Sequence, residues 1–419
     1  MSLPKPNCSF VIPSIHDALE LDCRIYYPRR TEQSFPLFGK SFAIFAHPYA
    51  PLGGSYDDPV VALCGSVLLQ HGCFLVTFNF RGAAGSLGRT SWSGKPELGD
   101  YVSVYGFLLC YIDAVCRPVV QKGQGAPILI LGGYSYGSMI TSYLPSIDIV
   151  ADLFKSPAPG SAESEIRLRA EDLSRDSRAY LDMHSAGVAL TLPRTRSGPE
   201  NDELKLSRGV TVGGYESDAA SRRVSRESSR RSIDGDKFRQ SIDRVRRKLS
   251  SRVINPFESE AQPPPGATTF PILPQLAYLL VSPLLPPIAG FITMFSKLRF
   301  IRKDREIAPP PGKEFHDLTI HPCYCLYGGK DIFTSDRKLQ RWAEDLSSRP
   351  GSQFVAVRAD TGHFWQEAEA IVRLRQGLAD WLKLLTSKPG DFETKVSADA
   401  GARWSIHGST KPGSLNPPE

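Results

Sequence analysis

Residues 127–137 read PILILGGYSYG, an apolar run that ends in a Gly-x-Ser-x-Gly motif centred on Ser135. The apolar run predicts a buried strand, and the residues from Ser138 onward predict a helix. A serine between a strand and a helix is typical of a nucleophile elbow, a turn so tight that its neighbours must be small. Gly133 and Gly137 meet that demand because they have no side chain to collide with the strand or the helix. We therefore expect the Ser135 hydroxyl at the end of a sheet, as a candidate nucleophile.

Two further candidates follow predicted strands, in the chain order Ser, Asp, His that accompanies such an elbow. Residues 322–327 read PCYCLY and predict a strand that leads to Asp331. Residues 353–357 read QFVAV and predict another strand, which leads to His363. We expect Ser135 to attack an acyl carbon and His363 to carry its proton to the leaving group, while Asp331 holds the imidazole tautomer.

Each candidate also has a plainer interpretation. Ser135 could cap a helix, Asp331 could be a turn residue, and Asp336 lies close enough in sequence to be a rival acid. The chain has eight histidines, and a single histidine is more often structural than catalytic. Three candidates in the required order, each on a loop that follows a strand, favour the catalytic interpretation of the set.

An acyl-transfer site also needs two backbone N–H donors for the developing oxyanion. The first is expected from Tyr136, the residue after the nucleophile. The second is expected from the loop after the predicted strand at 41–46, which reads HPYAPLGGS from His47. Pro48 has no N–H, so Tyr49 is the expected donor. We interpret His47 as a structural residue that braces this loop.

Several of these motifs resemble one known family. The run HPYAPLGGSYDD at 47–58 is similar to the His-Pro-rich oxyanion loop of small α/β-hydrolases described as dienelactone-hydrolase-like or Xaa-Pro-peptidase-like. The run FNFRGAAGS at 78–86 is similar to their Phe-Arg-Gly-x-Gly-x-Ser loop. The elbow itself also matches, as do GGKD at 328–331 and GHF at 362–364.

The resemblance covers residues 8–148 and 270–386, which we take as two parts of one hydrolase domain. It implies an α/β-hydrolase fold, in which a mostly parallel eight-stranded sheet carries helices on both faces. It also implies serine-hydrolase chemistry without naming a substrate. Caps in this superfamily commonly follow the strand that here begins at Tyr278, whereas this chain places a long insertion before it. The insertion is therefore not assumed to cover the site.

That insertion, residues 149–269, is rich in Ser, Arg, Glu, Asp, Gly and Pro and poor in aromatic residues. Such a composition buries too little apolar surface to offset the entropy of ordering the chain. We expect it to be disordered, and we expect the same of a tail at 387–419. Residues 222–252 carry twelve Lys or Arg and four Asp or Glu, while the whole chain has a net charge of only +6. The positive charge therefore belongs to the insertion and says nothing about the hydrolase domain.

Apolar residues recur at helical spacing within 222–252, so this block could form a basic amphipathic helix that contacts an acidic membrane surface or a protein. A solvated charged tract is the favoured alternative. Basic residues also precede three serines, a context that basophilic kinases favour. These candidate phosphorylation sites are Ser225, Ser232 and Ser250.

The compartment is expected to be the cytoplasm. The first residues show no secretory signal pattern, and the eight cysteines are scattered, many in apolar runs, as in a reduced protein. Residues 261–296 carry no charge, but their many prolines argue against a transmembrane helix. No metal-ligand cluster or phosphate-binding loop is present in the sequence, so no metal and no cofactor is expected.

We expect a serine hydrolase, most simply a carboxylic ester hydrolase, that cleaves an ester, thioester or lactone of a small acyl substrate. The apolar run at 284–291 would suit an acyl pocket. A peptidase or amidase with the same three residues is one alternative, although no carboxylate pair for a substrate amine can be located. A non-catalytic interaction protein that works through the basic insertion is another. The substrate, the oligomeric state and the role of the insertion stay open.

Overall fold

The computed structural model describes residues 2–29, 31, 34, 37–120, 125–186, 272–285, 300–302, 305–307 and 315–385. The strands are β1 (Cys8–Pro13), β2 (Glu20–Tyr26), β3 (Ser41–Ala46), β4 (Cys73–Phe78), β5 (Ile128–Tyr134), β6 (Gln275–Val281), β7 (Phe300–Arg302), β8 (Arg305–Ile307), β9 (Cys323–Gly328) and β10 (Phe354–Ala359). The helices are the 3-10 helix η1 (Ala50–Leu52), α1 (Pro59–Gln70), α2 (Lys95–Val120), α3 (Tyr136–Ser142), α4 (Ile147–Lys155), α5 (Ala162–Ala186), α7 (His316–Ile320), α8 (Asp336–Ser347) and α9 (Ala368–Leu384).

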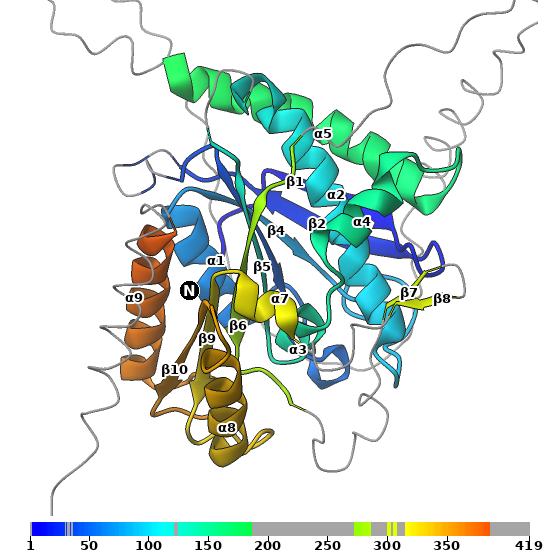
Figure 1. Cartoon of the computed structure of the whole chain (residues 1–419). Coiled ribbons are helices and arrows are strands. Elements are labelled where there is room, and N and C mark those ends of the chain that lie inside the picture. Colours follow the sequence, from blue (N-terminus) through cyan, green and yellow to red (C-terminus); the bar gives the residue numbers. More distant parts are fainter. Residues whose placement is uncertain are drawn as a thin grey trace, which may run out of the picture. The chain divides into compact units, whose positions relative to one another are not determined.

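Eight strands form one sheet in the order β1-β2-β4-β3-β5-β6-β9-β10 (Figure 1). Strand β2 pairs antiparallel with β1 and with β4, and the pairs from β4 through β3, β5, β6 and β9 to β10 are all parallel. Strands β7 and β8 pair separately with each other. The prediction of a mostly parallel eight-stranded sheet is confirmed.

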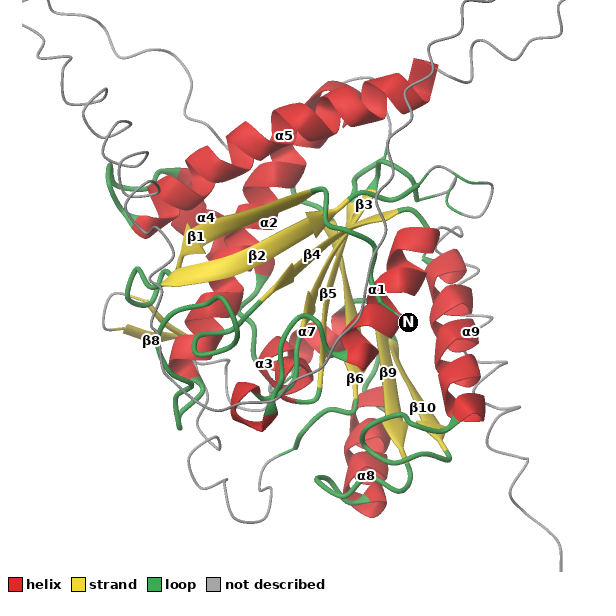
Figure 2. Cartoon of the chain, turned by 180° about the vertical axis from the view of Figure 1, so that it is seen from behind, coloured by secondary structure: helices red, strands yellow, loops and turns green. Residues whose placement is uncertain are grey.

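Helices cover both faces of the sheet, as the burial of every residue along β3, β4 and β9 requires. On β4, Phe74 and Val76 belong to one apolar cluster with α2 and α3, whereas Cys73 and Leu75 belong to another with α1 and α9. Figures 1 and 2 show α1 and α9 on one side of the sheet and α2 and α3 on the other. Each face of each central strand is therefore buried.

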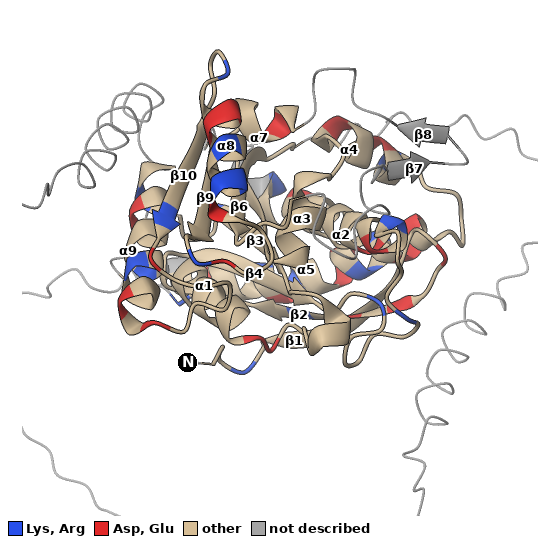
Figure 3. Ribbon diagram, turned by 90° about the horizontal axis from the view of Figure 1, so that it is seen from below, with Lys and Arg blue, Asp and Glu red and all other residues tan. Residues whose placement is uncertain are grey.

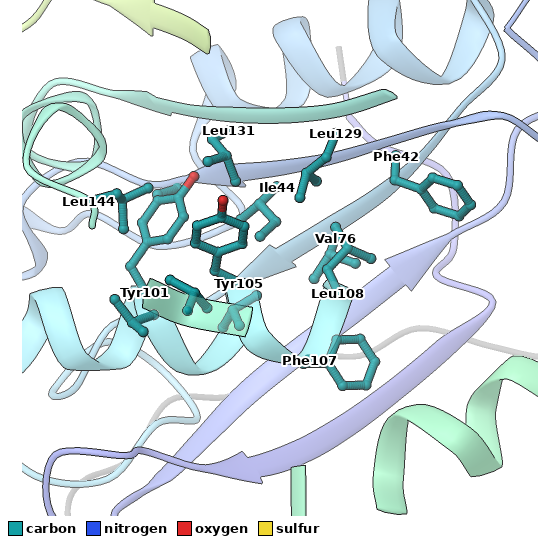
Figure 4. Packing of buried hydrophobic residues seen from close by; sticks show 14 of the residues in the cluster. Phe42, Ile44, Val76, Tyr101, Tyr105, Phe107, Leu108, Leu129, Leu131 and Leu144 are labelled. Carbon is teal, nitrogen blue, oxygen red and sulfur yellow. The ribbon is translucent and has the colours of Figure 1, made fainter. Parts of the chain in front are cut away.

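Helix α2 fills the larger of these clusters (Figure 4). Its residues Tyr101, Tyr105 and Leu108 pack toward the strands, where Ile44 and Leu131 face them. Among the described helices α2 is long and apolar enough to cross a membrane, but its apolar stretch is buried inside the protein. Charged residues occur instead on outer helices such as α8 and α9, while the central strands β3, β4 and β5 are largely uncharged (Figure 3). This pattern is that of a core helix.

The prediction of disorder from residue 149 is wrong for the first part of the insertion, where α4 and α5 form. Helix α5 packs against α2 and β1, and Ile166 and Ala170 are fully buried there. The Tyr180 hydroxyl donates a 2.7 Å hydrogen bond to the carbonyl of Pro28. Apolar and small residues recur along α5 every three or four positions, which gives a narrow buried stripe despite the polar composition.

Several other predictions fall outside the described residues. They include the insertion from residue 187 to 269, the basic block at 222–252, and the tail at 387–419. Ser225, Ser232 and Ser250 lie in the same part of the chain. The apolar run at 284–291 is described only as far as Leu285.

A pair of substitutions on α5 tests whether this helix belongs to the folded domain. Ile166→Ala should lower the free energy of unfolding by about 3 kcal/mol, because it leaves a cavity where the side chain is fully buried. Leu168→Ala, on the same helix but 63% exposed, should change it by less than about 0.5 kcal/mol. Urea unfolding of both variants measures the difference, and equal effects would mean that α5 is not packed on α2.

Candidate active site

The turn that carries Ser135 has the geometry of a nucleophile elbow. Ser135 joins β5 to α3 with φ 57° and ψ −114°, a backbone conformation that non-glycine residues rarely adopt. A Cβ on Gly133 would lie 2.4 Å from the carbonyl carbon of Gly137, and a Cβ on Gly137 would lie 2.6 Å from the carbonyl oxygen of Ala46. Only glycine fits at either position, so both glycines of the motif are explained by close backbone contact.

Ser135, His363 and Asp331 lie in hydrogen-bond contact at the carboxyl ends of β5, β10 and β9. The Ser135 Oγ lies 2.8 Å from His363 Nε2, and His363 Nδ1 lies 2.6 Å from Asp331 Oδ2. The side chains of His363 and Asp331 are almost completely buried. The structure therefore brings together the three residues that the sequence singled out, in the geometry of a Ser-His-Asp triad.

Asp331 is held from both ends of its carboxylate. Its Oδ2 accepts from His363, while its Oδ1 accepts backbone N–H bonds from Phe333 at 2.8 Å and Thr334 at 3.1 Å. The rival acid Asp336 instead begins α8 and binds Arg358 at 2.8 and 2.9 Å. Asp331, and not Asp336, is the carboxylate beside the imidazole.

Contacts that the sequence did not predict fix the loop that carries His363. The Tyr134 hydroxyl donates to the carbonyl of His363 at 3.0 Å, and the indole N–H of Trp365 donates to Ser282 Oγ at 2.9 Å. A Cβ on Gly328 would lie 2.3 Å from the carbonyl oxygen of Thr361, so the loops after β9 and β10 touch through backbone. These partners are far apart in sequence, and no local pattern marks them as supports of a histidine.

The two expected oxyanion donors lie side by side. The rings of Tyr49 and Tyr136 are 5.2 Å apart, which brings the loop after β3 against the first residue of α3. The carbonyl of Tyr49 accepts from Leu52 at 3.1 Å and from Gly54 at 3.2 Å, within the turn of its own loop. The structure thus places Tyr49 against Tyr136, the residue after Ser135, and the donation of their amides to an oxyanion remains a prediction.

His47 braces the loop after β3, as the sequence suggested. Its Nε2 accepts the backbone N–H of Phe80 at 2.9 Å, and its Nδ1 lies 2.5 Å from the carbonyl oxygen of Pro48. The guanidinium of the next residue, Arg81, donates two hydrogen bonds to the buried Asp100 of α2, at 2.6 and 2.9 Å, and its backbone N–H donates a third at 3.1 Å. The Nε2 bond of His47 therefore joins the loops after β3 and β4, and the Nδ1 contact holds the ring within its own loop. Arg81 ties the loop after β4 to α2.

Burial lowers the pKa of His47 from 6.5 to about 4. The imidazole is neutral near pH 7, with its proton on Nδ1, because Nε2 must accept the Phe80 N–H. Protonation of Nε2 would break that bond and bury a charge. His47 is thus a structural imidazole, and His363 is the histidine in contact with Ser135.

Within the described part of the chain, no group of three or more His, Cys, Asp or Glu side chains could hold a metal ion. The triad residues contact one another, backbone N–H groups and aromatic rings. The chemistry that this arrangement can perform with its own residues is proton transfer and nucleophilic attack.

Comparisons with known proteins give distant structural likenesses. No protein-family model matches the sequence, and a search of curated proteins finds no relative. The fold is similar to an α/β serine hydrolase homologue from Coxiella burnetii, at 15% identity over 90% of this chain and 99% of that one, with a TM-score of 0.39. A lidless α/β serine hydrolase from Xanthomonas campestris shares 14% identity over 92% of this chain and 99% of that one, with a TM-score of 0.41. An esterase from Pyrococcus furiosus shares 10% identity over 90% and 91%, also with a TM-score of 0.41.

At such low identity, the assignment rests on this structure's own topology. The strand order, the single antiparallel strand β2 inside an otherwise parallel run, and the elbow after β5 define the α/β-hydrolase fold. The expectation from the sequence motifs is confirmed at the level of the fold. The resemblance to the dienelactone-hydrolase-like enzymes still rests on the sequence motifs alone.

The depressed pKa of His47 predicts how stability depends on pH. The pKa of His47 is about 4 in the folded protein and about 6.5 in the unfolded chain, so between these pH values the unfolded chain is the more protonated at this residue. His47 therefore has no effect on the pH dependence of stability above pH 6.5. As the pH drops from 6.5 toward 4, the free energy of unfolding falls by about 3 kcal/mol in all. His47→Gln can still accept from Phe80 but does not titrate, so its free energy of unfolding should fall less over this range. Urea unfolding between pH 4 and 7 compares the two, and parallel profiles would refute the assignment.

Proposed function

We propose that the protein is a serine hydrolase that cleaves an ester, thioester or lactone through an acyl-enzyme on Ser135. The observation that carries this proposal is the contact series from Ser135 Oγ to His363 Nε2 at 2.8 Å and from His363 Nδ1 to Asp331 Oδ2 at 2.6 Å. An unactivated serine is a poor nucleophile, and a hydrogen-bonded base of this kind is what activates it. A carboxylic ester hydrolase is the simplest form of the proposal.

Acylation would begin with the Ser135 hydroxyl donating its proton to His363 Nε2 as the oxygen attacks the acyl carbon. The resulting imidazolium is stabilised by Asp331, whose carboxylate cannot turn away because Phe333 and Thr334 hold its second oxygen. The backbone N–H groups of Tyr49 and Tyr136 would stabilise the negative charge on the carbonyl oxygen. His363 then gives its proton to the leaving oxygen, and the bond to the leaving group breaks.

Deacylation repeats the same steps with water in place of the serine. His363 takes a proton from the water as it attacks the acyl carbon, and returns that proton to Ser135 Oγ as the acid product leaves. The rigid support of His363 by Tyr134 favours this exchange, because one imidazole must face first the leaving group and then the water.

Substitutions in the triad should remove turnover of p-nitrophenyl acetate and p-nitrophenyl butanoate without unfolding the protein. Ser135→Ala should lower kcat by about 10³-fold or more, since the nucleophile is lost. Asp331→Asn should lower it by about 10²-fold or more, since the imidazole loses its tautomer-fixing partner. Thermal unfolding should confirm that both variants remain folded.

Asp336→Asn is the matched control for Asp331→Asn. Asp336 binds Arg358 and makes no contact with His363, so this variant should keep kcat within about threefold of the parent protein. Full activity of Asp331→Asn together with loss of activity in Asp336→Asn would contradict the assigned acid.

A further inference from the structure

Two aromatic side chains border the imidazole of His363 on the loops that follow β9 and β10. The ring of Phe333 lies 4.6 Å from that of His363 at 63°, and the ring of Phe364 lies 5.4 Å from it at 85°. The two phenyl rings also contact each other, at 6.0 Å. His363 is therefore flanked by a continuous aromatic pair, which we call the Phe333–Phe364 pair.

This pair differs in exposure from the other groups around the imidazole. Ser135 and His363 are only 5% and 3% exposed, and Tyr134 beside them is buried. Phe364 is 54% exposed, and Phe333 is half-buried. A large apolar side chain so exposed next to a buried catalytic candidate is surface that a ligand can cover.

The surroundings of the pair are apolar in character. Ile332 is 76% exposed on the same loop as Phe333. Among the charged side chains of these two loops, Lys330 pairs with Asp360 at 3.0 Å and Glu367 accepts from Thr361. Each of these three charged side chains therefore has a polar partner within the two loops.

The chemistry of acyl transfer decides which part of a substrate reaches this pair. When the bond from the acyl carbon to the leaving oxygen breaks, His363 must deliver its proton to that oxygen. The leaving group therefore stands beside the imidazole, while the carbonyl oxygen points to the donors near Tyr49 and Tyr136. The Tyr134 ring, 5.5 Å from that of His363, is buried beside the nucleophile. The exposed ring in contact with the imidazole, that of Phe364, is therefore the one that a leaving group can meet.

We propose that the Phe333–Phe364 pair is the leaving-group subsite, and that the enzyme prefers esters of aromatic alcohols. This inference rests on the proposed function and narrows it to a substrate class. Edge-to-face contacts between an aromatic leaving group and these rings stabilise its binding, and burial of the exposed Phe364 surface adds to it. The step itself is unchanged: Ser135 Oγ bonds to the acyl carbon, and the alcohol departs with the proton from His363.

Two acetate esters test the proposal. Benzyl acetate and 2-methoxyethyl acetate form the same acyl-enzyme and release alcohols of similar acidity, so the ratio of their kcat/KM values reports recognition of the leaving group. Damage to the triad affects both esters and cancels in the ratio. The parent protein should favour benzyl acetate by about tenfold, and Phe364→Ala should lower that ratio by about fivefold. Phe364→Leu should lie between the two.

Two controls separate this role from a general effect of apolar surface. Leu168→Ala removes a side chain of similar exposure from α5 and should keep the parent's ratio. Methyl phenylacetate and methyl butanoate release the same alcohol and differ in the acyl group, so the first carries its aromatic ring on the acyl side. Phe364→Ala should change the ratio of their kcat/KM values by less than about twofold.

Three results would overturn the leaving-group subsite while leaving ester hydrolysis intact. Phe364→Ala could keep the parent's preference for benzyl acetate, or Leu168→Ala could lose that preference to the same extent. Phe364→Ala could also change the ratio for the two methyl esters instead of the ratio for the two acetates. If the parent protein cleaves none of the four esters, the carboxylic-ester form of the proposed function is overturned, and the subsite with it.

Discussion

At the elbow, the backbone of Gly137 lies so close to β3 that one added carbon would sit 2.6 Å from the carbonyl oxygen of Ala46 and 2.7 Å from that of His47. This contact joins the first turn of α3 to the beginning of the loop that carries Tyr49. Ser135, in its strained conformation, is the N-cap residue of that turn. One close packing of backbone on backbone therefore ties the element that presents Ser135 and Tyr136 to the start of the loop that carries Tyr49.

The remaining site residues reach Ser135 because the strands that precede them are parallel. Strands β5, β6, β9 and β10 are neighbours in the sheet, so the residues after β9 and β10 come to the same edge as the elbow. Gly328 lets the two loops touch, and Tyr134 reaches from beside the nucleophile to the backbone of His363. The sheet supplies the approximate positions of the three residues, and these contacts supply the hydrogen-bond distances.

The sequence predicted what is encoded locally. A strand, a turn motif and a helix mark Ser135 within a dozen residues, and strand-then-loop patterns mark Asp331 and His363. Helices α4 and α5 were missed because the composition of this segment is polar, whereas a stripe one residue wide, with Ile166 and Ala170, is enough to hold α5 in place. Tyr134, Trp365 and Phe333 were missed for another reason: their roles follow from loops that meet only in the folded sheet.

Covalent trapping tests directly whether Ser135 is an activated nucleophile. The purified protein is treated with a fluorescent fluorophosphonate, digested, and mapped by mass spectrometry. The account predicts one stoichiometric adduct on the peptide that contains Ser135, formed far more slowly after His363→Ala because the base is gone. A folded protein that stays unlabelled, or an adduct on another serine, would contradict it.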